Sequence, residues 1–451
     1  DLLAGARGKL RLTIWGHLWA SSSAHRAVFT RLNGLPVVML RLLTETLSRL
    51  GAAAFAASLC LAVVTPAFAV SASAAPLLAF AARIAGDDAR TRLVLDFDRR
   101  PDFQVHYVAN PYRILIDLPE TDFGIKADEL EARGIFSDIR YGSMAAGRSR
   151  IVLTASRPVG VVLAEVQEEQ GAASYRLVID TAIVTDQVFQ EQVEKQRWQE
   201  ASASAVAGET PVMLPGGRAD GPFVIAVDAG HGGIDNGARG GVTKTEEKNV
   251  TLAFAKALTG ELNKLPGTRA ILTRDKDEFL SLSQRVQLAR SEGANLLISI
   301  HADTLKQKDI RGATVYTISD KASDSLAASL AERENLSDQI AGISFVDEPA
   351  EVADILLDLT RRETQAFSIN LAQSVVSTFK DEVLLINNPH RHAGFRVLTA
   401  PDVPSILLEL GFMSNKDDEQ LLIDPAWQKK VAGLVAKAVG EYRTTVVANG
   451  G

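Results

Sequence analysis

Cysteine and histidine are scarce in this chain of 451 residues. The one cysteine is Cys60, in an apolar stretch near the start, and only seven histidines are present. A mature protein that begins after Cys60 has neither a disulfide nor a thiolate ligand for a metal ion. A metal site would therefore have to combine imidazoles from this short set with carboxylates.

An excess of positive charge is also lacking. The formal net charge is -7, with 48 Lys and Arg against 55 Asp and Glu. Because this balance gives no general basic surface, we exclude nucleic acid as a partner. The 46% of hydrophobic and 23% of charged residues are typical of globular proteins, and the length predicts two folded units with additional segments.

The apolar stretch Leu50 to Val64 is too short for a membrane span, at about 15 residues against the ~20 required. Two arginines precede it, and the small-x-small sequence Ala67-Phe68-Ala69 follows it. This pattern predicts a secretory signal peptide within residues 1–75 and an exported protein with no stable membrane span after cleavage. Residues 1–38, before the first methionine, are expected to be upstream sequence translated in error.

Residues 85–185 contain a series of short patterns that predict β-strands, without a long helical segment. The patterns occur at 92–97, 103–108, 113–118, 150–154, 160–166 and 175–180. This spacing predicts a small all-β sandwich. Because the region has no cluster of acids, histidines or nucleophiles, we expect it to serve in binding or targeting.

Residues 186–220 lack a sustained apolar stripe and end in Pro215-Gly216-Gly217. We interpret them as a linker that could begin as a short helix. From 221 to 445 strand and helix patterns alternate, which predicts an α/β catalytic domain with a mixed, largely parallel central sheet and flanking helices. Strands are predicted at 223–227, 269–273, 295–300, 312–318, 394–398 and 405–409, and helices at 249–262, 282–289, 322–380 and 426–442.

Three polar side chains lie at the carboxyl ends of predicted strands: His231, His301 and Glu409. Open α/β sheets build their sites at this edge. Glu246 and Glu247 lie on a loop that returns from His231, and one of them can reach the same crevice. Each signal is weak by itself, since a His-Gly-Gly sequence can be a simple turn and a strand-end histidine can be a core residue. Their coincidence at several strand ends favours a metal site.

Two imidazoles and one carboxylate would hold Zn²⁺ with one position open for water, as in catalytic zinc sites. The metal would acidify this water and polarise a substrate carbonyl. A further carboxylate must then pass the proton to the leaving amine, and Glu409 has apolar neighbours that can raise its pKa for that task. Asp303 could orient a ligating imidazole or be solvated in its loop. His390 and His392 are expected in a loop that either faces the substrate or is merely exposed.

The residues from Phe223 to Tyr442 resemble the zinc-dependent N-acetylmuramoyl-L-alanine amidases of the bacterial cell-separation type. The likeness rests on five segments in the family's order, which are Asp228-Ala229-Gly230-His231-Gly232-Gly233, Glu247-Lys248-Asn249-Val250, Leu272-Thr273-Arg274, Ser299-Ile300-His301-Ala302-Asp303 and Leu408-Glu409-Leu410-Gly411-Phe412. The resemblance implies that His231, Glu247 and His301 are zinc ligands. It also implies that Glu409 is the catalytic glutamate, and it favours Glu247 over Glu246 because the family's glutamate directly precedes the Lys-Asn-Val step.

The segment Asn110-Pro111-Tyr112-Arg113-Ile114-Leu115-Ile116-Asp117-Leu118 makes residues 85–185 look like the N-terminal targeting (AMIN-like) domain of such amidases. This resemblance implies cell-wall binding, a periplasmic location and recruitment to the division septum. Residues 323–362 are similar to an inserted regulatory segment whose helix covers the zinc in division amidases. By position Glu334 is the residue that blocks the zinc, with Glu332 as the alternative. The same charged run could equally be an exposed helix face.

The resemblance implies a peptidoglycan hydrolase that cleaves the amide between the lactyl group of N-acetylmuramic acid and L-alanine. Such an enzyme would act in septum splitting and daughter-cell separation, and a division-site activator protein would relieve its autoinhibition. A wall-binding scaffold with an inactive amidase unit is a second hypothesis, which the intact ligand set disfavours. A zinc peptidase that cuts within the stem peptide is the nearer alternative.

Overall fold

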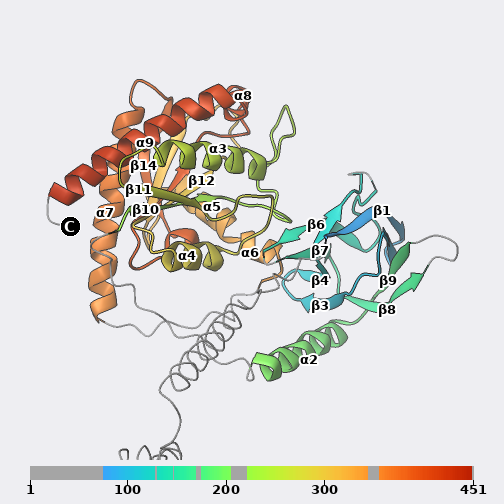
Figure 1. Cartoon of the computed structure of the whole chain (residues 1–451). Helices are drawn as coiled ribbons and strands as arrows, with labels where there is room; N and C mark the ends of the chain where they lie inside the picture. Colours follow the sequence, from blue (N-terminus) through green and yellow to red (C-terminus); the bar gives the residue numbers. More distant parts are fainter. Residues whose placement is uncertain are drawn as a thin grey trace, which may run out of the picture. The chain divides into compact units, whose positions relative to one another are not determined.

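The structure is a computed structural model that describes residues 75–126, 129–145, 147–168, 174–204, 221–343 and 355–448. The predicted signal peptide lies outside these residues. The described part of the chain forms a β-rich domain followed by an α/β domain, which confirms the fold class expected from the sequence (Figure 1). Among the described residues, no helix combines the length and the apolar character needed to cross a membrane.

The β-rich domain consists of two sheets around one apolar core. One sheet has the order β5 (Thr121–Phe123), β1 (Leu77–Gly86), β2 (Arg90–Phe97), β9 (Tyr175–Ile183) and β8 (Val159–Glu168). The other has the order β3 (Gln104–Val108), β4 (Tyr112–Pro119), β7 (Arg148–Ala155) and β6 (Phe136–Met144). Alternate residues of β2, namely Leu93, Leu95 and Phe97, are fully buried because one face of the strand lies on the core. The first strand, β1, begins before the predicted boundary at residue 85.

The segment expected to be a linker, 186–220, begins with a regular helix, α2 (Asp186–Ser204). Its Phe189 is fully buried, with its ring centroid 5.8 Å from that of Tyr107 and 5.1 Å from that of Tyr112. This packing stabilises a helix whose own sequence has no sustained apolar stripe, so the sequence pattern underestimated it. Residues 205–220 lie outside the described part of the chain.

The α/β domain is built on a six-stranded sheet. Its order is β11 (Thr268–Leu272), β10 (Phe223–Ala229), β12 (Leu296–His301), β15 (Ser405–Glu409), β13 (Ala313–Ile318) and β14 (Leu385–Ala393). The first four strands are parallel neighbours, whereas β13 is antiparallel to β15 and parallel to β14. The carboxyl ends of β10, β12 and β15 therefore meet at one edge, where the register pairs His301 with Glu409.

Helices cover both faces of this sheet. Helices α3 (Glu247–Leu262), α7 (Ile355–Phe379) and α9 (Pro425–Ala448) cover one face, and α4 (Leu282–Ser291) lies on the other (Figure 1). In β10, the side chains of Ile225 and Val227 pack into the core beneath α3, α7 and α9. Those of Val224 and Ala226 pack into the core beneath α4. Because both faces are buried, the parallel strands have continuous apolar runs.

Several segments differ from the sequence predictions. The helix predicted over 322–380 is interrupted, because α5 (Ser325–Asn335) and α6 (Ser337–Ile340) precede α7, and 344–354 lie outside the described residues. The strand predicted at 394–398 is wrong: the strand of this region is β14, which ends at Ala393, and the 3-10 helix η3 (Arg396–Leu398) follows it. His390 and His392 are therefore on a strand, not in a loop. As the last strand of the sheet, β14 tolerates Pro389, which made this run look like a loop. A short helix, α8 (Lys416–Leu422), was not predicted.

Candidate metal centre

The loop after β10 holds His231 in a buried position by an uncommon backbone conformation. His231 has φ = 61°, and Gly232 and Gly233 follow with φ of 128° and 56°. A left-handed conformation is unfavourable for a residue other than glycine, so the surroundings must stabilise it. Arg285 contributes to this: its Nη2 donates to the His231 carbonyl at 2.8 Å, and its Nη1 donates to Asp228 Oδ1 at 2.8 Å.

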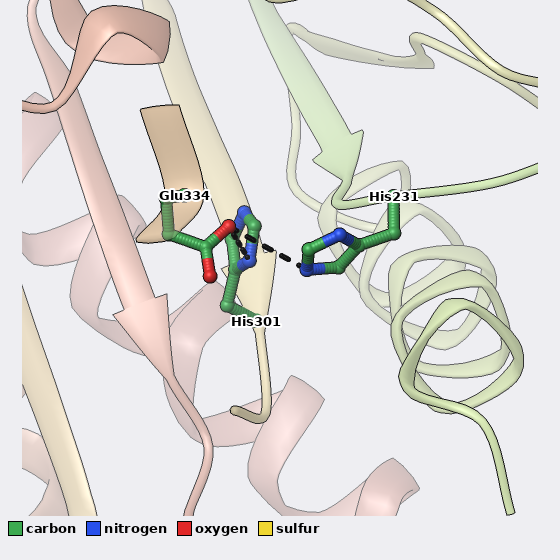
Figure 2. A group of neighbouring side chains, drawn as sticks. All are labelled: His231, His301 and Glu334. Atoms are coloured by element: carbon green, nitrogen blue, oxygen red, sulfur yellow. Dashed lines mark ion pairs between the residues drawn. The ribbon is translucent and has the colours of Figure 1, made fainter. Parts of the chain in front are cut away.

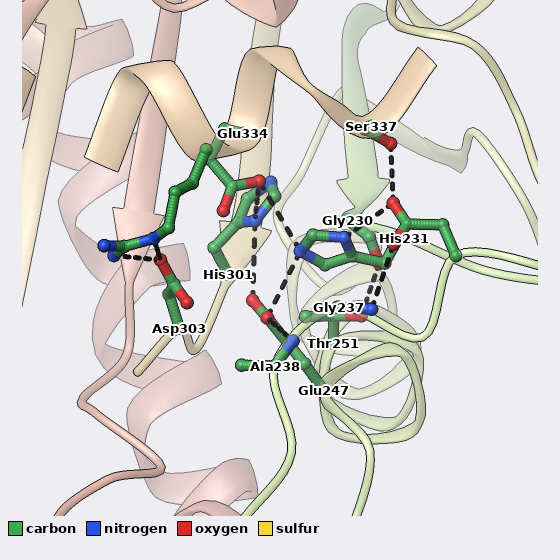
Figure 3. A network of polar contacts seen from close by, with 12 residues as sticks. Gly230, His231, Gly237, Ala238, Glu247, Thr251, His301, Asp303, Glu334 and Ser337 are labelled. Carbon is green, nitrogen blue, oxygen red and sulfur yellow. Dashed lines mark hydrogen bonds and ion pairs between the residues drawn. The ribbon is translucent and has the colours of Figure 1, made fainter. Parts of the chain in front are cut away.

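His301, at the end of β12, and Glu247, the first residue of α3, lie beside His231 (Figure 3). His231 Nε2 is 3.2 Å from Glu247 Oε2, and His301 Nδ1 is 3.5 Å from Glu247 Oε1. The same two carboxylate oxygens accept the backbone N–H groups of Ala238 at 2.8 Å and Ala302 at 2.7 Å. The Glu247 carboxylate is thus fixed between the two imidazoles.

Glu334, on α5, also faces both imidazoles (Figure 2). Its Oε2 lies 3.0 Å from His301 Nδ1 and 3.5 Å from His231 Nε2. His231, His301 and Glu334 offer ligand atoms that all lie within 4.8 Å of one another, and all three residues are buried. Glu332, the alternative from the sequence, is exposed. Of the two glutamates, Glu334 is the one that the structure places at the imidazoles.

Three observations show that these side chains fit a zinc ion. Among the described residues, His231 Nε2 and His301 Nδ1 are buried nitrogens without a hydrogen-bond partner of good geometry. Zinc ligands at 2.0–2.1 Å in a tetrahedron are separated by roughly 3.3 Å, and the contacts between these imidazoles and the carboxylates of Glu247 and Glu334 measure 3.0 to 3.5 Å. The adjoining cavity, of about 10 Å³, has room for roughly one water-sized particle.

The charges of the group support the same assignment. Burial disfavours a charge on His301, but the Glu334 and Glu247 carboxylates outweigh burial and raise the pKa of His301 to about 10. Burial is likewise outweighed at His231, where Glu247 and Asp235 raise the pKa well above its ordinary value. The imidazoles in turn hold the pKa of Glu247 well below its usual range despite burial. The surrounding carboxylates thus favour positive charge at the two imidazoles, a place suited to a divalent cation.

Glu409 ends β15 next to His301 and is fully buried. Its Oε2 accepts the backbone N–H of Asp303 at 3.2 Å, and its Oε1 has no hydrogen-bond partner in the described part of the chain. Burial raises the pKa of Glu409 well above its ordinary value, and the Glu247 carboxylate adds to this against the attraction of His301. The side chain can therefore hold a proton near neutral pH.

Asp303 and Glu246 have partners other than the imidazoles. Asp303 Oδ2 accepts from Arg333 Nη2 at 2.6 Å, which connects this strand-end residue to α5. Burial and neighbouring carboxylates raise the pKa of Asp303 to about 6, although Arg333 opposes the shift. Glu246 is the N-cap residue of α3, and its carboxylate lies 3.7 Å from Lys248 Nζ.

The sequence analysis did not single out Asp235, whose carboxylate contacts His231. Asp235 Oδ2 lies 2.9 Å from His231 Nδ1 and accepts a hydrogen bond from Ser337 Oγ at 2.6 Å. A bond at Nδ1 leaves Nε2 available for a metal. The only hint in the sequence was that an aspartate follows His231 by four residues. The two side chains meet because backbone hydrogen bonds between Gly232 and Asp235 close a turn, which this spacing does not predict.

Comparison with known proteins gives a family match over each domain. Residues 225–441 match the family described as N-acetylmuramoyl-L-alanine amidase, and residues 81–173 match the AMIN domain. The chain is 37% identical over 226 residues to the N-acetylmuramoyl-L-alanine amidase AmiA of Escherichia coli strain K12, which covers 50% of this chain and 78% of that relative. It is 30% identical over 365 residues to AmiC of Escherichia coli O6:H1, which covers 78% of this chain and 86% of that relative.

A crystal structure of an N-acetylmuramoyl-L-alanine amidase from Clostridium difficile 630 is similar over 50% of this chain and 98% of that chain, with 23% sequence identity and a TM-score of 0.37. The family assignment rests on the sequence relatives, which this chain matches over most of their length at 30% identity or more. The chain therefore belongs to the N-acetylmuramoyl-L-alanine amidase family and has an AMIN domain ahead of its amidase domain.

Proposed function

We propose that this protein is a zinc-dependent amidase of the periplasm that cleaves the bond between the lactyl group of N-acetylmuramic acid and L-alanine in peptidoglycan. The main support is a pair of buried imidazole nitrogens, beside Glu247 and Glu409, that have no hydrogen-bond partner of good geometry among the described residues, in a chain of this family. In the proposed organisation, a signal peptide within residues 1–75 directs export. The β-rich domain, 85–185, recruits the catalytic domain, 221–445, to the division septum.

In this proposal His231, Glu247 and His301 hold the zinc ion. Bound zinc would acidify a water molecule and polarise the scissile carbonyl. Glu409 accepts the proton of the attacking water and delivers it to the leaving amine. Its burial favours this exchange, because burial raises the pKa of Glu409 and so makes the ionised carboxylate a stronger proton acceptor.

In this proposal, the described conformation corresponds to a closed, autoinhibited state of the enzyme. Glu334 faces both imidazoles, so its carboxylate would occupy the position that a catalytic zinc site leaves for water. Helix α5 is held by the buried side chains Leu330 and Ala331 and by the ion pair between Arg333 and Asp303. A cavity of about 10 Å³ cannot admit a stem peptide. An activator protein at the division site would have to displace the segment 323–362 before the enzyme could split the septum.

Digestion of purified sacculi tests the proposed reaction. We expect the full chain with Glu334→Ala to release stem peptides that begin with a free L-alanine amine, and a chelator to abolish the release until zinc is added back. Mass spectrometry of the fragments identifies the bond. Cuts within the stem peptide would instead identify a zinc peptidase, and the absence of soluble fragments with and without zinc would favour a wall-binding scaffold.

Zinc binding is expected to release about two protons at pH 7. Both imidazoles are expected to be charged in the metal-free protein, since the pKa of His301 is raised to about 10 and that of His231 lies well above its ordinary value. Zinc binds the neutral rings, so each must lose its proton. Isothermal titration calorimetry in buffers of different ionisation enthalpy measures this number. The variant Glu334→Gln should release fewer protons, because the lost carboxylate supports both charges. Release of no protons by the parent protein would contradict the assignment.

A further inference from the structure

Helices α5 and α6 form the segment that covers the metal centre, called the closed segment below. Besides Glu334, its residue Ser337 makes a second polar contact with the centre. Its hydroxyl donates to Asp235 Oδ2 at 2.6 Å, and the same oxygen lies 2.9 Å from His231 Nδ1. Ser337 is 4% exposed and Asp235 is 1% exposed. Ser337 follows Glu334 by three residues, about one helical turn, so both side chains lie on the side of the segment that faces the metal centre (Figure 3).

Asp235 is held in place independently of this segment. Its Oδ1 accepts the backbone N–H of Gly237 at 3.1 Å. Its backbone exchanges two hydrogen bonds with Gly232, at 2.8 and 3.0 Å. The carboxylate would therefore stay directed at His231 Nδ1 if the segment moved away. An acceptor at one imidazole nitrogen fixes the ring and its tautomer, which prepares the other nitrogen to bind a metal.

Other polar contacts of the segment attach it to the rest of the domain but do not involve Asp235, the carboxylate that contacts His231. Arg333 pairs with Asp303, but its side chain is 38% exposed, so solvent weakens the pair. Asp338 accepts the backbone N–H of Leu282 at the start of α4. By contrast, the contact between Ser337 and Asp235 is buried and charge-assisted, which makes it the stronger kind of hydrogen bond.

We propose that Asp235 is a positioning residue for His231 and that Ser337 uses the same carboxylate to anchor the closed segment. This inference rests on the zinc and autoinhibition roles proposed above. The closed state then has two attachments with different requirements: Glu334 needs a positive charge at the centre, whereas Ser337 needs Asp235. Because the second attachment does not involve the metal, it holds the segment in the metal-free protein as well.

Hydrogen exchange of the metal-free full chain tests the anchor. We expect Ser337→Ala to accelerate amide exchange within 325–340 about tenfold, because one buried, charge-assisted hydrogen bond no longer opposes local opening. Ser325→Ala is the matched control, since this serine of the same segment is exposed, and it should exchange like the wild type. Unchanged exchange in Ser337→Ala would overturn the anchor. This measurement needs neither zinc nor substrate, so it stands apart from a failure of the proposed function.

Zinc affinity measured by chelator competition tests the positioning role. In a Glu334→Ala background, which removes the carboxylate of the closed segment from the zinc site, adding Asp235→Asn should weaken zinc binding about 10- to 100-fold. Adding Ser337→Ala to the same background should leave the affinity unchanged. Equal thermal stability of the metal-free variants serves as the control for folding. Unchanged affinity in the Asp235→Asn protein would overturn the positioning role, whereas absence of zinc binding in the Glu334→Ala parent would refute the proposed function itself.

Discussion

Replacing Glu409 with glutamine is expected to lower amide hydrolysis by about 10³-fold while zinc content stays at the wild-type level. General acid and base groups contribute rate factors of about this size. Glutamine has nearly the shape of glutamic acid, so the buried site at the end of β15 should remain packed. It cannot accept the proton of the attacking water, however. Peptide release from sacculi, together with metal analysis, measures both parts of this expectation.

The control for this variant is Glu382→Gln, because Glu382 is exposed and distant in sequence from every proposed site residue. It should digest sacculi at the wild-type rate. An active Glu409→Gln enzyme would show that another group moves the proton. Loss of zinc together with activity would instead make Glu409 part of the metal-holding set.

Glu334→Ala is expected to raise basal hydrolysis about 10- to 100-fold in the absence of an activator. The substitution removes the carboxylate that lies 3.0 Å from His301 Nδ1 and 3.5 Å from His231 Nε2, and with it the charge that favours the closed state. A shift of this size requires a change of about 1.4 to 2.8 kcal/mol between closed and open states. Initial rates on sacculi at saturating zinc measure it.

Glu332→Ala is the matched control, since it changes the same residue type on the same helix but at an exposed position. Its basal rate should equal that of the wild type. Equal rates in a well-folded Glu334→Ala variant would count against autoinhibition by this residue. A rise in Glu332→Ala alone would assign the blocking role to the other carboxylate.

The strand-end residues could be predicted because the relevant pattern is local. Each of the parallel strands β10, β12 and β15 is a short apolar run, and the carboxyl ends of parallel neighbours must meet at one edge of the sheet. His231, His301 and Glu409 were recognised as candidates on this basis alone. Their proximity follows from strand order and register, and the structure confirms that His301 and Glu409 are paired neighbours. Their zinc and catalytic roles stay predictions.

Elements that depend on distant packing were predicted poorly. Helix α2 has little amphipathic pattern of its own and is stabilised by the contacts of Phe189 with two tyrosines of the β-rich domain. Strand β14 contains Pro389 and two asparagines, which are typical of loops, yet pairing with β13 makes it an edge strand. In both cases the stabilising partner is far away in sequence, so no local window contains it.

The sequence by itself determined the two-domain class, the apolar strands and the polar residues that end them, because side-chain periodicity reports burial directly. Only the tertiary structure distinguished Glu334 from Glu332. The directions of the two side chains differ by about 200° around the helix axis, and burial of Leu330 and Ala331 in the core decides which of them faces the imidazoles. The tertiary structure also revealed Asp235 and Ser337 as partners across 102 positions of the chain. A hydrogen bond between segments so far apart in the sequence follows from the geometry of the fold, for which residue spacing contains no signal.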